Sequence, residues 1–179
     1  MTGGVRIAGV VAAVIVTAIV AIHAEESLHI VPAVRDAQVT VSVEVADGYA
    51  DDVRDAISSG LRTTFSYDVE LRMIVRGWVD RTIATAVIGT TDQYDNLTRR
   101  HSLSRTVDGR TDDAAVTEDD AAVRRWLTTL NRLPLCATNK LERNREYYVR
   151  VSARKQPQRT FPFGWSSSIS GQAKFTFIP

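Results

Sequence analysis

Hydrophobic and polar positions follow three patterns along this chain of 179 residues: an unbroken apolar run, strict alternation, and helical spacing. The apolar run extends from Ile7 to Ile22 and contains no charged residue. At about 1.5 Å per helical residue it reaches roughly 24 Å, short of the ~30 Å hydrocarbon core unless flanking residues contribute. The pattern indicates either an N-terminal transmembrane helix or the apolar part of a cleavable signal peptide.

We expect an uncleaved anchor over residues 1–26, although Ala24 also offers a small-residue cleavage site before Glu25. The expected anchor residues are Ile7, Val10, Val11, Val14, Ile15, Ala18, Ile19 and Ile22. Arg6 precedes the run and acidic residues follow it, so the positive-inside rule places the N-terminus in the cytoplasm. We therefore expect a single-pass protein of the inner membrane whose main domain is periplasmic.

Beyond the anchor, alternation with a period of two predicts strands. Residues 27–37, which include Pro32, are expected to form a linker or a first edge segment. Val39 to Val45 alternate with polar residues, which predicts a strand with one buried face. Further strands are expected over residues 64–75, 78–90, 97–107, 110–116, 146–154 and 174–178. Gly77 and Asp108-Gly109 are expected to form turns.

Helical spacing appears in two places. Residues 51–59 predict a short helix that stops at Gly60, and Thr117 is expected to cap a second helix that ends before Pro134. In the second helix, one face carries Val123, Trp126, Leu127 and Leu130. Antiparallel strands with one or two short helices in the connections predict a mainly β fold, an antiparallel β-sandwich over residues 38–179.

Charge and cysteine content narrow the classes of function. Arg6 is the one basic residue before the end of the apolar run, so 21 of the 22 Lys and Arg residues remain in the exported part, against 21 acidic residues. This neutrality argues against a nucleic-acid partner, because phosphate binding needs clustered positive charge. Cys136 is the single cysteine, so an internal disulfide is impossible.

Candidate catalytic and metal-binding residues are few. His101 could act as a general base beside Asp80 or Asp95 in a hydrolase, but a structural hydrogen bond is the expected role of a strand histidine. His23 and His29 could ligate a metal or pigment, but boundary histidines are more often simply interfacial. An acidic cluster could bind calcium, although its spacing does not match an EF-hand; it comprises Asp108, Asp112, Asp113, Glu118, Asp119 and Asp120. We therefore predict no enzyme, no metal and no cofactor.

Three aromatic residues, Phe161, Phe163 and Trp165, lie in a segment punctuated by Pro162 and Gly164. Exposed aromatic side chains on a loop favour a partner surface or a membrane interface. The alternative is that these rings fold back over the open edge of the sandwich. We treat the three aromatics as candidate partner-docking residues.

The chain also resembles a known family. The resemblance rests on DAISSGLRTTFSYDVELRMIVRGWVD (Asp55–Asp80), YDNLTRRHSLS (Tyr94–Ser104), the segment around Trp126, and LERNREYYVRVSAR (Leu141–Arg154). These segments are similar to an uncharacterised bacterial family of exported proteins, described only as a domain of unknown function. The resemblance implies an N-terminal signal or anchor and a periplasmic β-rich domain, with genes often near a sensor kinase. It implies no reaction, cofactor or catalytic residue.

Together these observations predict a non-catalytic, membrane-anchored periplasmic subunit that docks on a larger inner-membrane complex and contacts its membrane subunits and the lipid bilayer. The particular complex that we expect is a bacterial photosynthetic reaction centre with its light-harvesting ring. The alternative is a periplasmic sensory or ligand-binding module that works with a membrane sensor kinase, and this would require an apolar cavity inside the sandwich.

Overall fold

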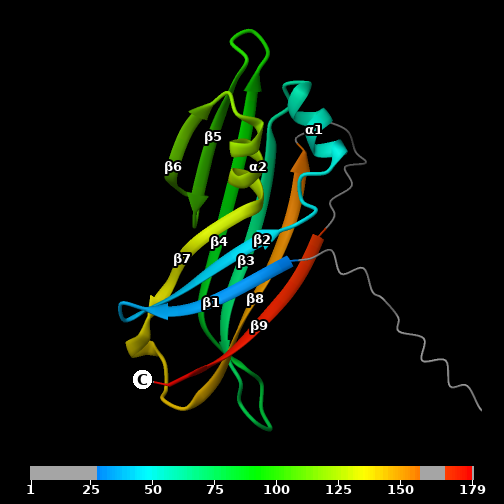
Figure 1. Cartoon of the computed structure of the whole chain (residues 1–179). Coiled ribbons are helices and arrows are strands. Elements are labelled where there is room, and N and C mark those ends of the chain that lie inside the picture. The colour runs from blue at the N-terminus through cyan, green and yellow to red at the C-terminus, as the bar shows by residue number, and fades with distance from the viewer. Residues whose placement is uncertain (1–27, 158–167, 179) are drawn as a thin grey trace, which may run out of the picture.

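The computed structural model describes residues 28–157 and 168–178, which form two antiparallel sheets and two short α-helices (Figure 1). The smaller sheet has the strand order β1-β2-β7, with β1 at Leu28–Arg35, β2 at Gln38–Val45 and β7 at Thr129–Ala137. The larger sheet has the order β6-β5-β4-β3-β8-β9. Its strands are β3 (Thr63–Met73), β4 (Arg81–Asp95), β5 (Arg100–Val107), β6 (Arg110–Thr117), β8 (Arg145–Pro157) and β9 (Ser168–Phe177). The predicted mainly β class is confirmed.

Alternating side chains of the two sheets share one hydrophobic core. In β2 the valines at 39, 41, 43 and 45 are all buried, and in β3 the buried side is formed by Phe65, Tyr67, Val69, Leu71 and Met73. Burying one such side chain contributes about 1.5–3 kcal/mol. The strong period-two pattern of β2 and β3 therefore places the core between the sheets.

The two helices cover the part of the larger sheet that the smaller sheet does not reach (Figure 1). Helix α1 spans Asp51–Ser58 and buries Val53 and Ile57, while α2 spans Asp120–Thr128 and buries Val123 and Leu127. Both helices contact β3 and β4. A short 3-10 turn, η1, follows β7 at Thr138–Lys140.

The sheets also meet along one side, where β1 packs against β9 (Figure 1). A Cβ atom added to Gly171 of β9 would lie 3.3 Å from the side chains of both Leu28 and Ile30 of β1. Residues 28–35 of the segment expected as a linker or first edge segment thus form a strand of the core fold. Pro32 is compatible with this strand because β1 is an edge of its sheet.

The connection after α2 differs from the expected one. The helix begins after Asp119, whose side chain accepts a hydrogen bond from the Ala121 N–H at 2.9 Å, and Thr117 instead accepts from the Asp119 N–H. It ends at Thr128, well before Pro134, and the chain enters β7 without a loop. Leu130, expected on the helix, is a buried residue of β7.

Other boundaries move by a few residues. β4 begins at Arg81 and ends at Asp95, so Trp78 lies in the turn before it, where Gly77 adopts a φ of 78°. Leu97, expected on a strand, lies in the β4–β5 turn and is 95% exposed. β9 begins at Ser168, six residues before the strand predicted over residues 174–178.

The predicted anchor residues of positions 7–22 and the candidate docking residues Phe161, Phe163 and Trp165 lie outside the described residues. In the described ranges, neither helix is both long and apolar enough to cross a bilayer.

Candidate functional site

A cleft of about 500 Å³ lies between α1 and the start of α2, above the β4–β5 hairpin. We call it the helix cleft; its lining residues are Tyr49, Arg54, Ile57, Ser58, Tyr94, Arg99, His101, Glu118 and Asp120. The cleft exists because the smaller sheet leaves this end of the larger sheet to the two helices. It therefore combines strand residues at its floor with helix and loop residues at its rim.

The floor of the helix cleft contains a buried histidine–carboxylate pair. Nδ1 of His101 lies 3.0 Å from Oδ2 of Asp92, and both side chains are almost completely buried. The β4–β5 register opposes His101 to Tyr94 and Asp92 to Leu103, so Asp92 and His101 are diagonal neighbours on one face. The Tyr94 ring lies 4.5 Å from the His101 ring. Strand pairing thus fixes the orientation of the imidazole.

The second ring nitrogen of His101 faces helix α2. Its Nε2 atom lies 3.5 Å from Oδ1 of Asp120, the first residue of that helix, and the Asp120 side chain is largely exposed. A carboxylate in the first turn is favourably placed against the positive end of the helix dipole. His101 consequently links β4 to α2 through two acidic side chains.

Burial raises the pKa of Asp92, and the hydrogen bond from His101 opposes that rise. Oδ1 of Asp92 has no hydrogen-bond partner among the described residues. Burial also raises the pKa of Tyr49 at the cleft rim, and the negative charges of Asp120 and Asp92 add to this effect. Perturbed, incompletely satisfied groups beside a cavity are typical of functional sites.

The acids proposed to assist His101 in a hydrolase have other positions. Asp80 lies at the base of the β3–β4 hairpin, where it accepts hydrogen bonds from the Val75 N–H and the Tyr148 hydroxyl. Asp95 accepts from the Leu97 and Thr98 N–H groups in the β4–β5 turn, and these bonds lower its pKa. The hydrogen-bonded acid beside His101 is Asp92 and neither Asp80 nor Asp95.

Asp92 was missed because the sequence pattern ended the strand at residue 90. Asp92 precedes His101 by nine residues, with one turn between them, and both residues lie on strands whose side chains alternate between the two faces of the sheet. This spacing is the signal that could have identified Asp92. The cleft also contains a hydroxyl, that of Ser58, but this group donates to the Asp55 carbonyl oxygen at 3.0 Å. Among the described residues that line it, the cleft therefore provides a hydrogen-bonding pocket in which Ser58 is not activated by His101.

The other predicted ligands are dispersed. His29 is exposed on β1, and His23 lies outside the described residues. Within the acidic cluster, Asp108 accepts from the Val87 N–H and Asp119 caps α2. In the part of the chain that the structure describes, no group of three or more His, Cys, Asp or Glu residues is arranged to hold a metal ion.

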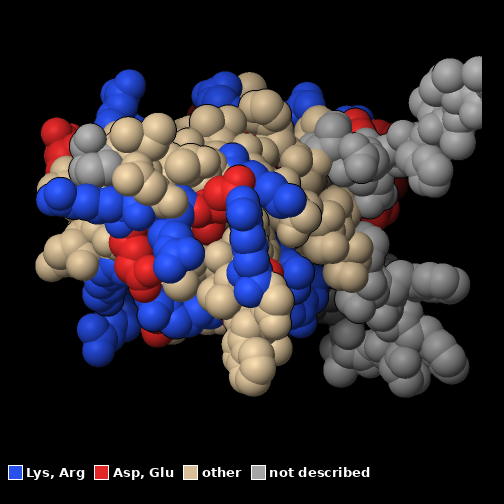
Figure 2. Space-filling view, turned by 90° about the horizontal axis from the view of Figure 1, so that it is seen from below, with Lys and Arg blue, Asp and Glu red and all other residues tan. Residues whose placement is uncertain are grey.

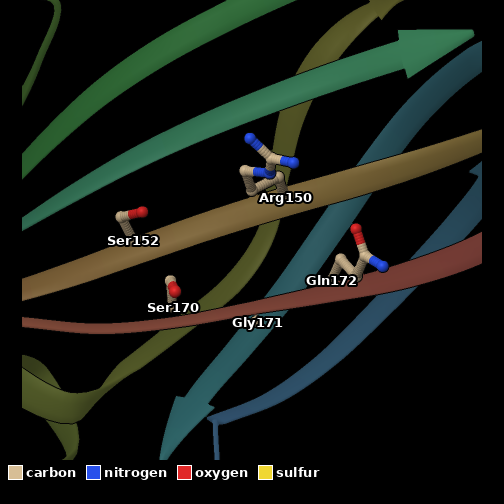
Figure 3. A pocket seen from close by; sticks show the side chains of 5 residues that line it. All are labelled: Arg150, Ser152, Ser170, Gly171 and Gln172. Atoms are coloured by element: carbon tan, nitrogen blue, oxygen red, sulfur yellow. The ribbon is translucent and has the colours of Figure 1, made fainter. Parts of the chain in front are cut away.

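A second hollow, of about 360 Å³, lies on the outer face of the larger sheet (Figure 3). Figure 3 shows its lining side chains on the neighbouring strands β8 and β9, where Ser152 faces Ser170 and Arg150 faces Gln172. The hollow forms because the two serines are shorter than their neighbours. It contains no buried ionisable pair, so the helix cleft is the better candidate site.

These features define the class of the protein: a mainly β, two-sheet domain with a polar helix cleft and a buried histidine–aspartate pair. The chain belongs to the DUF4390 family, described as a domain of unknown function, whose model matches residues 26–160. This confirms the resemblance to a family of unknown function. The matched segment includes β1 and extends through β8. The comparison with curated proteins found no match, and the comparison with solved structures found none either.

Proposed function

We propose that this protein is a non-catalytic subunit, anchored in the inner membrane by its N-terminal segment, whose periplasmic domain docks on a larger membrane complex. The observation that supports the proposal is the side-by-side arrangement of β1 and β9, which begin on the same side of the domain (Figure 1). Gly171 of β9 lies directly against Leu28 and Ile30 of β1.

This arrangement matters because each strand continues from a segment that the sequence assigns to docking. The predicted anchor precedes Leu28, and the aromatic segment with Phe161, Phe163 and Trp165 precedes Ser168. Both segments are therefore attached to one side of the domain. A domain held to the bilayer through Leu28 would present this same side to neighbouring membrane subunits.

The proposal assigns no catalysis to the helix cleft. One ring nitrogen of His101 is occupied by Asp92 and the other faces Asp120 at 3.5 Å, while the nearby Ser58 hydroxyl is bonded to the main chain. A general base needs a free ring nitrogen within hydrogen-bond reach of the group that it deprotonates. The cleft geometry is better suited to binding or to structural support.

The test is purification of the tagged full chain from its own host in mild detergent, followed by mass spectrometry of the co-purifying proteins. Replacement of Phe161, Phe163 and Trp165 by Ser is expected to reduce the amount of co-purifying complex. Leu97→Ser, a change at an exposed site in the β4–β5 turn, is the matched control and should have no effect.

Reaction-centre and light-harvesting subunits among the co-purifying proteins would support the particular complex that we propose. A different membrane complex would retain the docking proposal and replace that partner. A monomer free of other chains, or unchanged assembly after the triple aromatic replacement, would contradict docking through this side of the domain.

A sensory or ligand-binding role is the second candidate, and the helix cleft is the observation that favours it. The cleft has a volume of about 500 Å³, which is in the range of small-molecule sites. It is lined by polar and charged side chains and lies between the helices, so it is not the apolar cavity inside the sandwich that a sensory module would require. Native mass spectrometry of the purified full chain would detect a retained small molecule, and Tyr94→Ala should release it.

A further inference from the structure

The β3–β4 hairpin ends in two consecutive exposed hydrophobic residues. Trp78 is 81% exposed and Val79 is 74% exposed. No other pair of consecutive large hydrophobic residues in the described ranges has this exposure. Single exposed hydrophobic residues are common on protein surfaces, but a tryptophan and a valine together at a projecting tip indicate a contact surface.

Hydrogen bonds at its base hold this tip in a defined conformation. Oδ1 of Asp80 accepts from the Val75 N–H at 3.2 Å, and Oδ2 accepts from the Tyr148 hydroxyl at 3.0 Å. The Asp80 carbonyl oxygen accepts from Arg72 at 3.0 Å, and the Trp78 N–H donates to the Val75 carbonyl at 3.1 Å. The exposure of Trp78 is therefore part of an ordered hairpin, which lowers the entropic cost of binding through the tip.

Several basic side chains lie near the tip, beside the acidic side chains of Asp80 and Glu142. Arg76 is exposed and lies two residues before Trp78. The connection between β7 and β8 is joined to the hairpin base by the ion pair of Arg81 and Glu142, at 2.9 Å, and it contributes the exposed side chains of Lys140 and Arg143. Figure 2, the view from below, shows Lys and Arg side chains spread over this end of the molecule, with Asp and Glu side chains between them.

We propose that the β3–β4 tip inserts into the headgroup region of an anionic lipid bilayer. Trp78 and Val79 enter the boundary between headgroups and acyl chains, where tryptophan is favoured because its ring is apolar and its N–H can still donate a hydrogen bond. Arg76 and the neighbouring basic residues contact lipid phosphates, which attract basic side chains.

A bilayer fits these observations better than a protein partner does. A stable protein interface buries roughly 800 Å² on each side, most of it around a packed core. Here the exposed apolar surface is confined to two adjacent side chains at a narrow tip, and its surroundings are charged. Interfacial membrane binding combines burial of apolar surface with electrostatic attraction to anionic lipids, and the tip offers both.

The experiment uses the full chain incorporated into vesicles of phosphatidylcholine alone or with one-third phosphatidylglycerol. In a Trp126→Phe/Trp165→Phe background, Trp78 is the remaining tryptophan, and its fluorescence reports the tip. We expect a shift of its emission to shorter wavelength and reduced quenching by acrylamide in the anionic vesicles only. High salt should reverse both changes, because it screens the attraction between arginine and lipid phosphate. The anchor is present in both vesicle types, so the difference isolates the tip.

A second measurement avoids the packing changes of the double tryptophan variant. The otherwise unmodified chain is labelled with 5-fluorotryptophan, and the Trp78 fluorine resonance is assigned with Trp78→Phe. Spin-labelled lipid should broaden this resonance in anionic vesicles, and Arg76→Ser should reduce the broadening. Trp78 that stays fully accessible to acrylamide and unbroadened in anionic vesicles would overturn the proposal and leave a protein surface as the target of the tip.

The vesicles contain no partner proteins, so this result is independent of docking on a membrane complex. Loss of lipid contact at Trp78 would leave co-purification unaffected, and loss of co-purification would leave the lipid contact unaffected.

Discussion

At the residue scale, the buried pair of Asp92 and His101 is the clearest departure from a simple hydrophobic core. Burial of a carboxylate is unfavourable unless its oxygens are hydrogen-bonded, and only Oδ2 of Asp92 has a partner among the described residues. The pKa of Asp92 is raised because burial disfavours the charged carboxylate relative to the protonated carboxyl group. Because the folded protein binds the Asp92 proton more tightly than the unfolded chain does, this residue stabilises the fold below its unfolded pKa of about 3.9. That contribution is lost as the pH rises through the folded pKa.

The predicted consequence is a pH-dependent difference between the wild type and Asp92→Asn. As the pH is lowered from about 7 to about 4, the difference in unfolding free energy should shift in favour of the wild type. Urea denaturation at several pH values measures it. Asp95→Asn is the control of opposite sign: hydrogen bonds lower the pKa of Asp95, so its stabilising contribution is present above the unfolded pKa and is lost as the pH falls. A shift of the Asp92→Asn difference in the same direction as the control would disprove this account.

At the element scale, the abrupt transition from α2 to β7 depends on the larger sheet. The Leu127 carbonyl accepts a hydrogen bond from the Tyr67 hydroxyl and one from Thr90 Oγ1, at 3.1 Å. Both donors are buried residues of neighbouring strands. Because the sheet satisfies this carbonyl, the chain can leave the helix at once and enter a strand.

A double-mutant cycle tests this role. Tyr67→Phe and Thr90→Val should each lower the unfolding free energy by about 1 kcal/mol, because one donor still satisfies the carbonyl. The double variant should lose more than the sum, since the buried Leu127 carbonyl is then left without a side-chain donor, at a cost of roughly 1–3 kcal/mol. Chemical denaturation measures all three changes. Additive losses would show that the two bonds do not share one acceptor in solution.

The local pattern of hydrophobic and polar residues was sufficient to predict the elements that bury one face and expose the other. β2, β3 and α1 lie close to their predicted positions because one face of each is apolar and the other polar. β7 could not be predicted, because the end of α2 is set by Tyr67 and Thr90, which are remote in sequence. The same limit applies to the helix cleft: His101 was identified, but its partner Asp92 depends on strand register.

At the scale of the whole molecule, the packing of β1 on β9 joins the smaller sheet to the edge of the larger one, and Gly171 permits it. A leucine at this position would place its side chain on Leu28 and Ile30, because even a Cβ atom would lie 3.3 Å from both. Gly171→Leu should therefore force β1 away from β9 and lower the unfolding free energy by about 1–3 kcal/mol.

Ser170→Leu is the matched control: Ser170 lies on the same strand but on the outer face, beside the hollow of Figure 3. Thermal unfolding measures both variants, and amide hydrogen exchange of β1 should accelerate in Gly171→Leu alone. If the two leucine variants unfold alike, the β1–β9 contact does not hold the sheets together, and the proposal that the expected anchor and the aromatic segment are attached to one side of the domain loses its structural basis.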